Sequence, residues 1–417
     1  MIKGLLFSSY CLLIFSEVRT ISYHLAGNRS TSIAELFFLV MGISCVVFVI
    51  IKKKGRVSRQ HVRVGMYLFS AFSALALISL FMSRGFYLLN PLFFGPIVVF
   101  FFLSYWLFAY VNEENSCLYV YCYSILMLIL FIAQFFILIY VFNNDSYFAI
   151  FKYLAYGEGT PALHKPFNSP SQAGLYISIV LFLMVGCAIS KGTRWPLYLL
   201  VPPAFLTLAQ TGSRSVMLLV SVCWVAFVFF IFINRRYSTK QINTNVIHLM
   251  MCSLLVLTVF NLDLFNNVSR ERSLSIFNLS PLTIITGGTD DSWRHEVWKE
   301  TIQNAIYTSS YGTKSSEGST HNVYLDFLKY LGPITFLFFV GFAFWVVCKG
   351  VRLLFRMRRD PYYPFYLSLL ISTVLVMGEL YANPVLHLRY IWVFFGLTTA
   401  ILIKWKFNFF KNRGENF

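Results

Sequence analysis

Long apolar stretches with few charges recur along the whole chain and restrict it to very few folds. A membrane-spanning helix needs about 20 mostly apolar residues. The apolar residues are continuous rather than alternating, which argues against a β-barrel. The stretches lie near 4–22, 33–51, 64–82, 91–110, 117–142, 173–189, 196–211, 216–233, 247–263, 323–346, 363–380 and 389–404.

The composition fits many membrane spans. Hydrophobic residues make up 58% of the chain and charged residues 12%, whereas a soluble domain is about a quarter charged. We therefore predict an all-α polytopic membrane protein with about twelve transmembrane helices. The first stretch has no small-residue cleavage signal, so we expect it to be an uncleaved helix rather than a signal peptide.

The formal net charge is +17, but this charge does not predict a nucleic-acid partner. The basic residues form short clusters between apolar stretches, a distribution typical of membrane topology. The eight Cys residues lie within or beside apolar stretches, and none has a CxxC or metal-type spacing. They are predicted to be small apolar residues, and no metal or cofactor is expected.

The basic clusters also predict the orientation in the membrane. With Lys3 in the cytoplasm, more than half of the 34 Lys and Arg residues fall on the cytoplasmic side. Lys and Arg are enriched in cytoplasmic loops. Both termini are therefore expected in the cytoplasm, and the two longest hydrophilic stretches, near 143–172 and 264–322, on the outer face. Hydrophilic stretches of this length are commonly functional.

Arg214 follows one apolar stretch and precedes another, in "AQTGSRSVML". An ionisable residue at or near membrane depth is costly and often functional. Its neighbour Ser213 and the adjacent small residues could donate hydrogen bonds, and a guanidinium forms a planar fork for anionic oxygens. We interpret Arg214 as part of a phosphate site. The structural alternative is an arginine that snorkels to the interface.

His321 begins the stretch "HNVYLDFLKYLGPIT", immediately before the start of an expected apolar helix. Gly332 follows eleven residues later, so a continuous helix would place both on one face. Pro333 is expected to bend or begin the deeper helix. A neutral His at an aqueous boundary could act as a general base. A structural hydrogen-bonding role is the alternative.

Further polar candidates share the predicted outer face. Lys165 and Arg294 are cations there, and "DDSWRHEVWKETI" predicts a short amphipathic helix with Trp293, Val297 and Ile302 at helical spacing. The acidic pair that opens this segment, 290–291, is expected to cap the helix rather than bind metal. Glu379, near the outer end of its span, could pair with an outer-face arginine, as a structural or a site residue.

The His321 stretch resembles the signature of the O-antigen ligase and polymerase superfamily. In that family, His and a small amide or hydroxyl residue precede nine residues, then Gly, two residues, and Gly, Thr or Tyr. His321, Asn322, Gly332 and Thr335 occupy these positions. Three upstream stretches resemble other family segments in the family order: "FNSPSQAG", "TGSRS" and "RHEVW".

The resemblance implies a GT-C-like fold with a mostly helical periplasmic loop. Region 1–150 would hold N-terminal transmembrane helices. Region 151–350 would be the catalytic region, with periplasmic loops near 143–172 and 264–322. Region 351–417 would hold C-terminal transmembrane helices and a cytoplasmic tail. The protein would lie in the bacterial inner membrane with its active site facing the periplasm.

The resemblance also implies an inverting, metal-independent glycosyl transfer without a cofactor. The donor would be an undecaprenyl-diphosphate-linked oligosaccharide, and the acceptor a lipid-linked repeat unit or the lipid A core. A chain-length regulator is a further candidate partner. Implied catalytic residues are His321, Arg214 and Arg294, and implied substrate-binding residues are Lys165, Asn322, Ser213 and Gly332.

Three functions remain open on the sequence. A polymerase would join repeat units, whereas a ligase would move the finished chain onto the lipid A core by the same chemistry. The compact outer loop and the abundance of Phe and Tyr favour the polymerase. A transporter or flippase without catalysis is the third candidate. The chain has no visible internal repeat, and its polar candidates gather on one face rather than at the midplane.

Overall fold

The structure is a computed structural model of the chain. It describes residues 22–25, 29–32, 64–82, 98–105, 113–143, 170–211, 213–234, 292–307, 322–357, 360–382 and 389–411. Nearly all of these residues are helical. The exception is an antiparallel hairpin of β1 (Ser22–Leu25) and β2 (Arg29–Ser32), with Ser22 opposite Ser32. The apolar pattern does not predict this hairpin, which follows the first apolar stretch and precedes the second.

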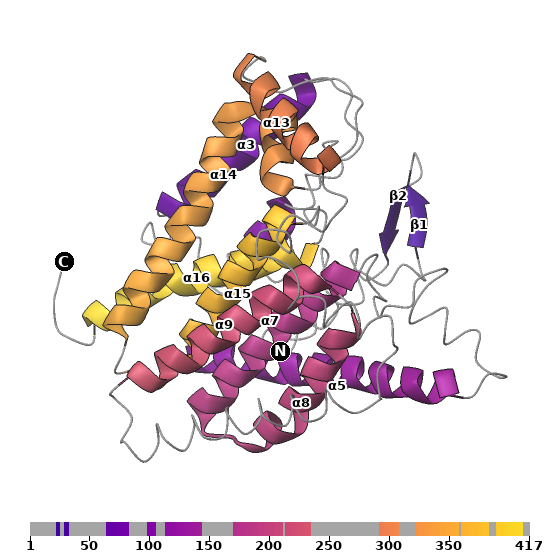
Figure 1. Cartoon of the computed structure of the whole chain (residues 1–417). Coiled ribbons are helices and arrows are strands. Elements are labelled where there is room, and N and C mark those ends of the chain that lie inside the picture. The colour runs from indigo at the N-terminus through magenta and orange to yellow at the C-terminus, as the bar shows by residue number, and fades with distance from the viewer. Residues whose placement is uncertain are drawn as a thin grey trace.

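The helices coincide with the apolar stretches and include one amphipathic segment. Residues 98–105 are also helical. The labelled helices are α3 (Val64–Met82), α5 (Glu113–Asn143), α7 (Pro170–Lys191), α8 (Trp195–Gln210), α9 (Arg214–Ile233), α13 (Ser292–Tyr307), α14 (Val323–Arg356), α15 (Tyr363–Ala382) and α16 (Arg389–Lys411) (Figure 1).

Five helices in the described part of the chain are long and apolar enough to cross a membrane, namely α5, α7, α9, α14 and α15. Shorter apolar helical segments lie within α3 and α16. The coarse prediction of a helical, multi-pass membrane protein is therefore confirmed. The stretches near 4–22, 33–51 and 247–263 lie outside the described residues.

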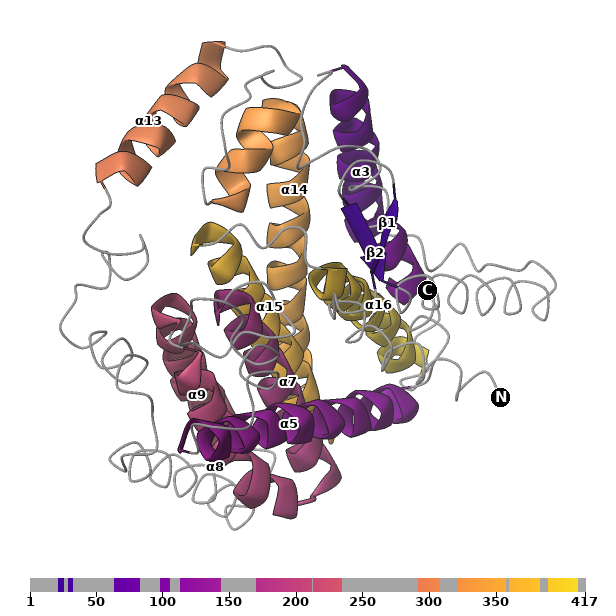
Figure 2. The same ribbon diagram turned by 90° about the vertical axis from the view of Figure 1, so that its right-hand side faces the viewer.

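Helix α7 is the central helix of the described structure, with nearly all of its length buried. A helix that is hydrophobic all round is buried on every face. It packs against α5, α8, α9 and α15. Gly186 allows the closest approach, because a Cβ there would lie 2.6 Å from the Pro364 carbonyl oxygen. Helix α5 runs across α7 rather than along it (Figure 2).

Helix α8 returns along α7 after a three-residue link. Its end lies at the start of α7, since a Cβ at Gly174 would be 3.2 Å from Thr211 Oγ1. Its 16 residues cover about 24 Å at 1.5 Å per residue, less than the roughly 30 Å hydrocarbon core of a bilayer. It is not among the five long spans, although it reaches from one end of α7 to the other.

Aromatic side chains fill the interface of α3, α14, α16 and the 98–105 helix. The rings of Phe69 and Phe101 stack with centroids 3.5 Å apart, and Phe72 meets Phe327 edge-on at 5.4 Å. One buried apolar cluster runs from Phe69 to Leu402. Residues from all three predicted sequence regions therefore share a single core.

The outward faces of α9 and α14 remain apolar. Val225 is 70% exposed, with Val222 and Phe229 exposed one turn away, and on α14 Phe344 is 69% exposed and Leu337 is 65% exposed. A large exposed apolar surface marks contact with another apolar phase. These faces are suited to lipid, in agreement with membrane-spanning helices.

The helical bundle has two chemically different ends. We call residues 172–176, 209–217, 322–325 and 377–381 the motif end, because these segments lie together and contain or adjoin the stretches selected from the sequence. At the opposite end, Phe365 N donates to Ser190 Oγ at 3.2 Å and Tyr363 Oη donates to the Phe230 carbonyl at 3.5 Å. We call this the basic end, since it carries Lys191, Arg194, Lys349, Arg352 and Arg356.

Candidate functional site

Asn322 begins helix α14 as its N-cap. Its Oδ1 accepts hydrogen bonds from the backbone N–H groups of Tyr324 at 3.0 Å and Leu325 at 3.2 Å. The side chain is 2% exposed. An Asn cap satisfies helix N–H groups that have no partner within the helix. The oxygen of this predicted substrate-binding residue therefore fixes the start of α14, immediately after His321 in the sequence.

Gly332 breaks α14 into two helical segments. Its backbone has φ 83° and ψ 166°, a region that is essentially restricted to Gly. Pro333 then begins the second segment, as the Gly-Pro pair predicts. The expected single helix face for His321 and Gly332 is wrong, because α14 starts after position 322 and position 332 itself leaves helical geometry.

The last turns of α15 contact two of the segments selected from the sequence. Tyr324 Oη donates to the Met377 carbonyl at 3.1 Å, which holds the start of α14 against α15. Ser215 Oγ donates to Glu379 Oε1 at 3.4 Å, which holds the start of α9 nearby. Residues 377–381 thus join the His321 stretch to the Arg214 stretch.

Helix α13 adds a third segment to this region. Trp298 is 8% exposed, and its ring meets Tyr381 edge-on with centroids 5.5 Å apart. The predicted amphipathic helix is therefore present, but its predicted apolar face is partly wrong. Ile302 is 47% exposed, whereas Trp298 and Thr301 are buried, because the large Trp298 ring turns its own side of the helix toward α15.

The start of α7 completes the motif end. A Cβ at Gly174 would be 3.2 Å from both Thr211 Oγ1 and Val216 Cγ1, so "FNSPSQAG" directly contacts "AQTGSRSV". Buried Ser213 begins α9, where its carbonyl accepts from Met217 N at 3.0 Å. The Ser213 N–H donates to Thr211 Oγ1 at 3.4 Å. These two hydrogen bonds hold the backbone of Ser213, immediately before Arg214.

The predicted site residues are described to different extents. The structure places Ser213, Asn322 and Gly332 fully, and the three lie at or beside the motif end. Arg214 and Arg294 are placed by their backbone alone, in the first turns of α9 and α13. Lys165 and His321, with the acidic pair 290–291, lie outside the described residues.

The sequence predicts Ser215 as a neighbour of Arg214 that could supply a hydrogen bond. Tyr324 and Tyr381 were not predicted as members of this region. These two carry no sequence signal, because their contacts join helices far apart in the chain. Within the described residues, no three His, Cys, Asp or Glu side chains come together as a metal site.

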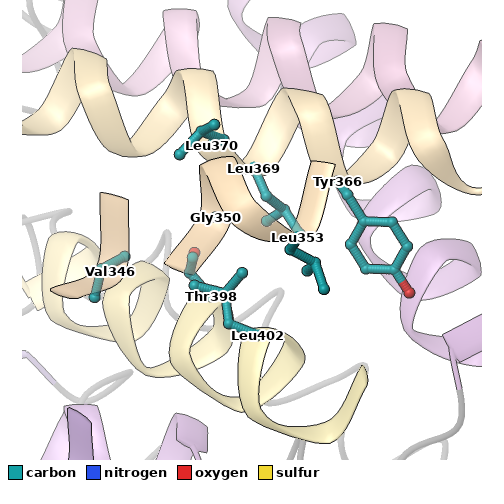
Figure 3. Close-up of a pocket in the computed structure, with 8 residues that line it drawn as sticks. All are labelled: Val346, Gly350, Leu353, Tyr366, Leu369, Leu370, Thr398 and Leu402. Atoms are coloured by element: carbon teal, nitrogen blue, oxygen red, sulfur yellow. The ribbon is translucent and has the colours of Figure 1, made fainter. Parts of the chain in front are cut away.

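A small cavity lies away from the motif end, between α14, α15 and α16 (Figure 3). Its volume is about 10 Å³, close to the space that one water molecule needs. Thr398 contributes a buried hydroxyl, which has no hydrogen-bond partner among the described residues. The lining residues are Val346, Gly350, Leu353, Tyr366, Leu369, Leu370, Thr398 and Leu402. The cavity is too small for a lipid-linked glycan.

The chain matches no protein-family model and no curated protein.

Proposed function

We propose that this protein is a membrane glycosyltransferase that polymerises undecaprenyl-diphosphate-linked glycans, joining repeat units of a surface polysaccharide. The main observation in support of this proposal is that stretches far apart in the sequence contact one another. Ser215, Tyr324 and Trp298 join α9, α14 and α13 to the last turns of α15. Gly174 joins the start of α7 to the start of α9. These stretches are the ones that resemble the O-antigen ligase and polymerase superfamily.

The proposed reaction is a single displacement at the anomeric carbon of the donor. The acceptor hydroxyl oxygen forms the new glycosidic bond as its proton passes to His321. The bond from the anomeric carbon to the diphosphate oxygen breaks, and the lipid diphosphate leaves. Arg214 and Arg294 neutralise the leaving diphosphate. The N-terminus of α9 adds a favourable dipole for an anion. One displacement inverts the anomeric configuration.

The proposed setting is the bacterial inner membrane, with twelve spans, both termini in the cytoplasm and the motif end toward the periplasm. The separation of the two ends supports this orientation. Arg194, Arg352 and Arg356 are exposed and lie at the basic end, where the preference of cytoplasmic segments for Lys and Arg would place them.

The test is a surface-glycan gel of a deletion strain with and without the wild-type gene. A polymerase predicts loss of the ladder, with one repeat unit still attached to the lipid A core. Loss of all attached glycan, with polymer accumulating on the lipid carrier, would instead identify a ligase. Repeat units trapped on the cytoplasmic side would contradict both and identify a flippase.

A further test uses purified protein and lipid-linked repeat units in the presence of EDTA. Polymer should form without a divalent ion, because the arginines supply the positive charge. A strict requirement for added magnesium or manganese would contradict the proposed mechanism.

A further inference from the structure

Thr398 brings a hydroxyl group to the small cavity between α14, α15 and α16. The side chain is buried, and its Oγ1 accepts or donates no hydrogen bond among the described residues. Burying a hydroxyl without a partner is unfavourable, because the group loses its hydrogen bonds to water. The described part of the chain supplies no group that offsets this cost.

Other buried hydroxyl groups of the apolar helices have a partner within their own helix. Thr373 Oγ1 donates to the Leu369 carbonyl at 2.8 Å, and Thr207 Oγ1 donates to the Pro203 carbonyl at 2.8 Å. Each bond reaches the carbonyl four residues earlier, an arrangement that Ser and Thr commonly adopt in helices. Thr398 differs, since Figure 3 shows its oxygen pointing from α16 toward the ribbon of α14 beside Gly350.

Gly350 leaves the backbone of α14 uncovered on the side of the cavity. The side chain of a helical residue lies beside the carbonyl four residues earlier, which is why a hydroxyl can reach that carbonyl. Gly350 has no side chain, so the carbonyl of Val346 is open to a further hydrogen bond. Both residues line the cavity together with Thr398. One hydroxyl and one carbonyl oxygen are therefore available to the same small space.

The size of the cavity selects a very small guest. Its volume is about 10 Å³, near the smallest space that holds one water molecule. A buried water molecule needs at least two polar partners, and Thr398 with the Val346 carbonyl provides two. Arg352 is exposed two residues after Gly350, so the cavity lies close to the basic end of the bundle, where water is near.

We propose that this cavity binds one water molecule, which bridges α16 to α14. The water accepts a hydrogen bond from Thr398 Oγ1 and donates one to the carbonyl oxygen of Val346. It thereby satisfies the buried hydroxyl and joins two helices that the sequence separates. The inference depends on helix packing alone and is independent of the proposed glycosyl transfer.

The first test compares two neighbouring threonines by the thermal unfolding midpoint of the purified full-length protein. Thr399 is the matched control, because it is also buried on α16 and its Oγ1 also has no hydrogen-bond partner among the residues that the structure describes, but it does not line the cavity. Val keeps the shape of Thr and removes only the hydroxyl group, so the two substitutions differ in the cavity alone.

The two variants should shift the midpoint in opposite directions. Thr398→Val should lower it by about 1–2 °C, because the bridging water loses a partner. Thr399→Val should raise it, because an unpartnered buried hydroxyl is replaced by a methyl group. A midpoint of Thr398→Val equal to or above that of Thr399→Val would mean a dry cavity and would overturn the proposal.

The second test needs no variant to fold. A crystal or cryo-EM structure of the full-length protein, at a resolution that shows ordered water, should contain one water oxygen about 2.8 Å from both Thr398 Oγ1 and the Val346 carbonyl oxygen. An empty cavity, or a Thr398 hydroxyl turned back to the Phe394 carbonyl, would overturn the proposal.

Discussion

The two ends of the helical bundle differ in the charged residues they carry. At the basic end, Arg194, Arg352 and Arg356 are exposed. At the motif end, Asn322 is 2% exposed and Glu379 is 0% exposed. Exposed charges cost little and set orientation in the membrane, whereas buried polar groups require partners. We interpret the exposed charge at the basic end as a determinant of membrane topology and the buried carboxylate at the motif end as part of the proposed site. Burial of a polar side chain alone does not distinguish the ends, because Asn234 at the basic end of α9 is also 2% exposed.

Glycines in the bundle serve two different purposes. At the basic end, Gly350 makes room for a neighbouring helix, because a Cβ there would lie 2.7 Å from Leu370 Cδ1. Gly332, farther along α14 than the motif end, has a positive φ of 83°, and Gly192 at the basic end has a φ of 69°. Gly350 needs only a small side chain, whereas Gly332 and Gly192 need a backbone that other residues rarely adopt. A positive φ therefore does not by itself distinguish the two ends.

The largest expected effect comes from the arginines of the motif end. Arg214→Ala or Arg294→Ala should lower glycan transfer by at least about 100-fold, as for a lost transition-state donor. Lys at either position should retain a little activity, because the charge survives and the planar fork does not. The measurement is polymer yield normalised to protein in the membrane. Full activity in Arg214→Ala would return that residue to an interfacial, snorkelling role.

The next effect tests the strained backbone of α14. Gly332→Ala should destabilise the protein by ~1–3 kcal/mol and reduce transfer, since it shifts the helix that begins after His321. The control is Gly341→Ala on the same helix, where a Cβ would meet only Leu68 Cδ2 at 3.9 Å. Thermal unfolding should separate the two variants. Equal midpoints would contradict the need for glycine at position 332.

A smaller effect tests the cap of α14. Asn322→Ala should cost about 1 kcal/mol in stability, because two backbone N–H groups lose their acceptor. Asn322→Asp keeps the acceptor and should retain the stability of wild type. The activity of Asn322→Asp then distinguishes the capping role of Asn322 from a role in substrate binding. An Asp variant with normal stability and no transfer would show that the amide nitrogen also contacts substrate.

The smallest effect is expected at the basic end. Arg352→Gln and Arg356→Gln, singly, should change stability by less than about 0.5 kcal/mol and leave transfer unchanged, because both side chains are exposed. The same gel and unfolding assay apply. A loss of transfer as large as that of Arg214→Ala would remove the proposed distinction between the two ends.

Much of the fold could be predicted from apolar stretches. Helices α3, α14, α15 and α16 begin at the residues where the apolar stretches begin. A segment that lies in lipid must be apolar and must also satisfy its backbone hydrogen bonds internally, as a helix does. The end of α14 was predicted ten residues early. Its Lys349, Arg352 and Arg356 continue the helix beyond the apolar stretch, since long basic side chains can leave the apolar phase.

The site could be predicted only as separate stretches. The sequence indicates "TGSRS" and "HN", but periodicity contains no information about which helices meet. The Tyr324–Met377 and Ser215–Glu379 contacts each join distant segments, so the role of α15 emerges only from packing. Of the two α15 residues in these contacts, Glu379 had a sequence signal, as an acid within an apolar span.

The most direct measurement compares one histidine from each predicted side of the membrane. A deletion strain would receive wild type, His321→Ala or His61→Ala, and surface glycan would be run on a gel beside a measure of protein in the membrane. His61 lies in a basic cluster predicted to be cytoplasmic. We predict that His321→Ala removes the ladder at normal protein level while His61→Ala preserves it. An intact ladder in His321→Ala would contradict a catalytic base at the motif end.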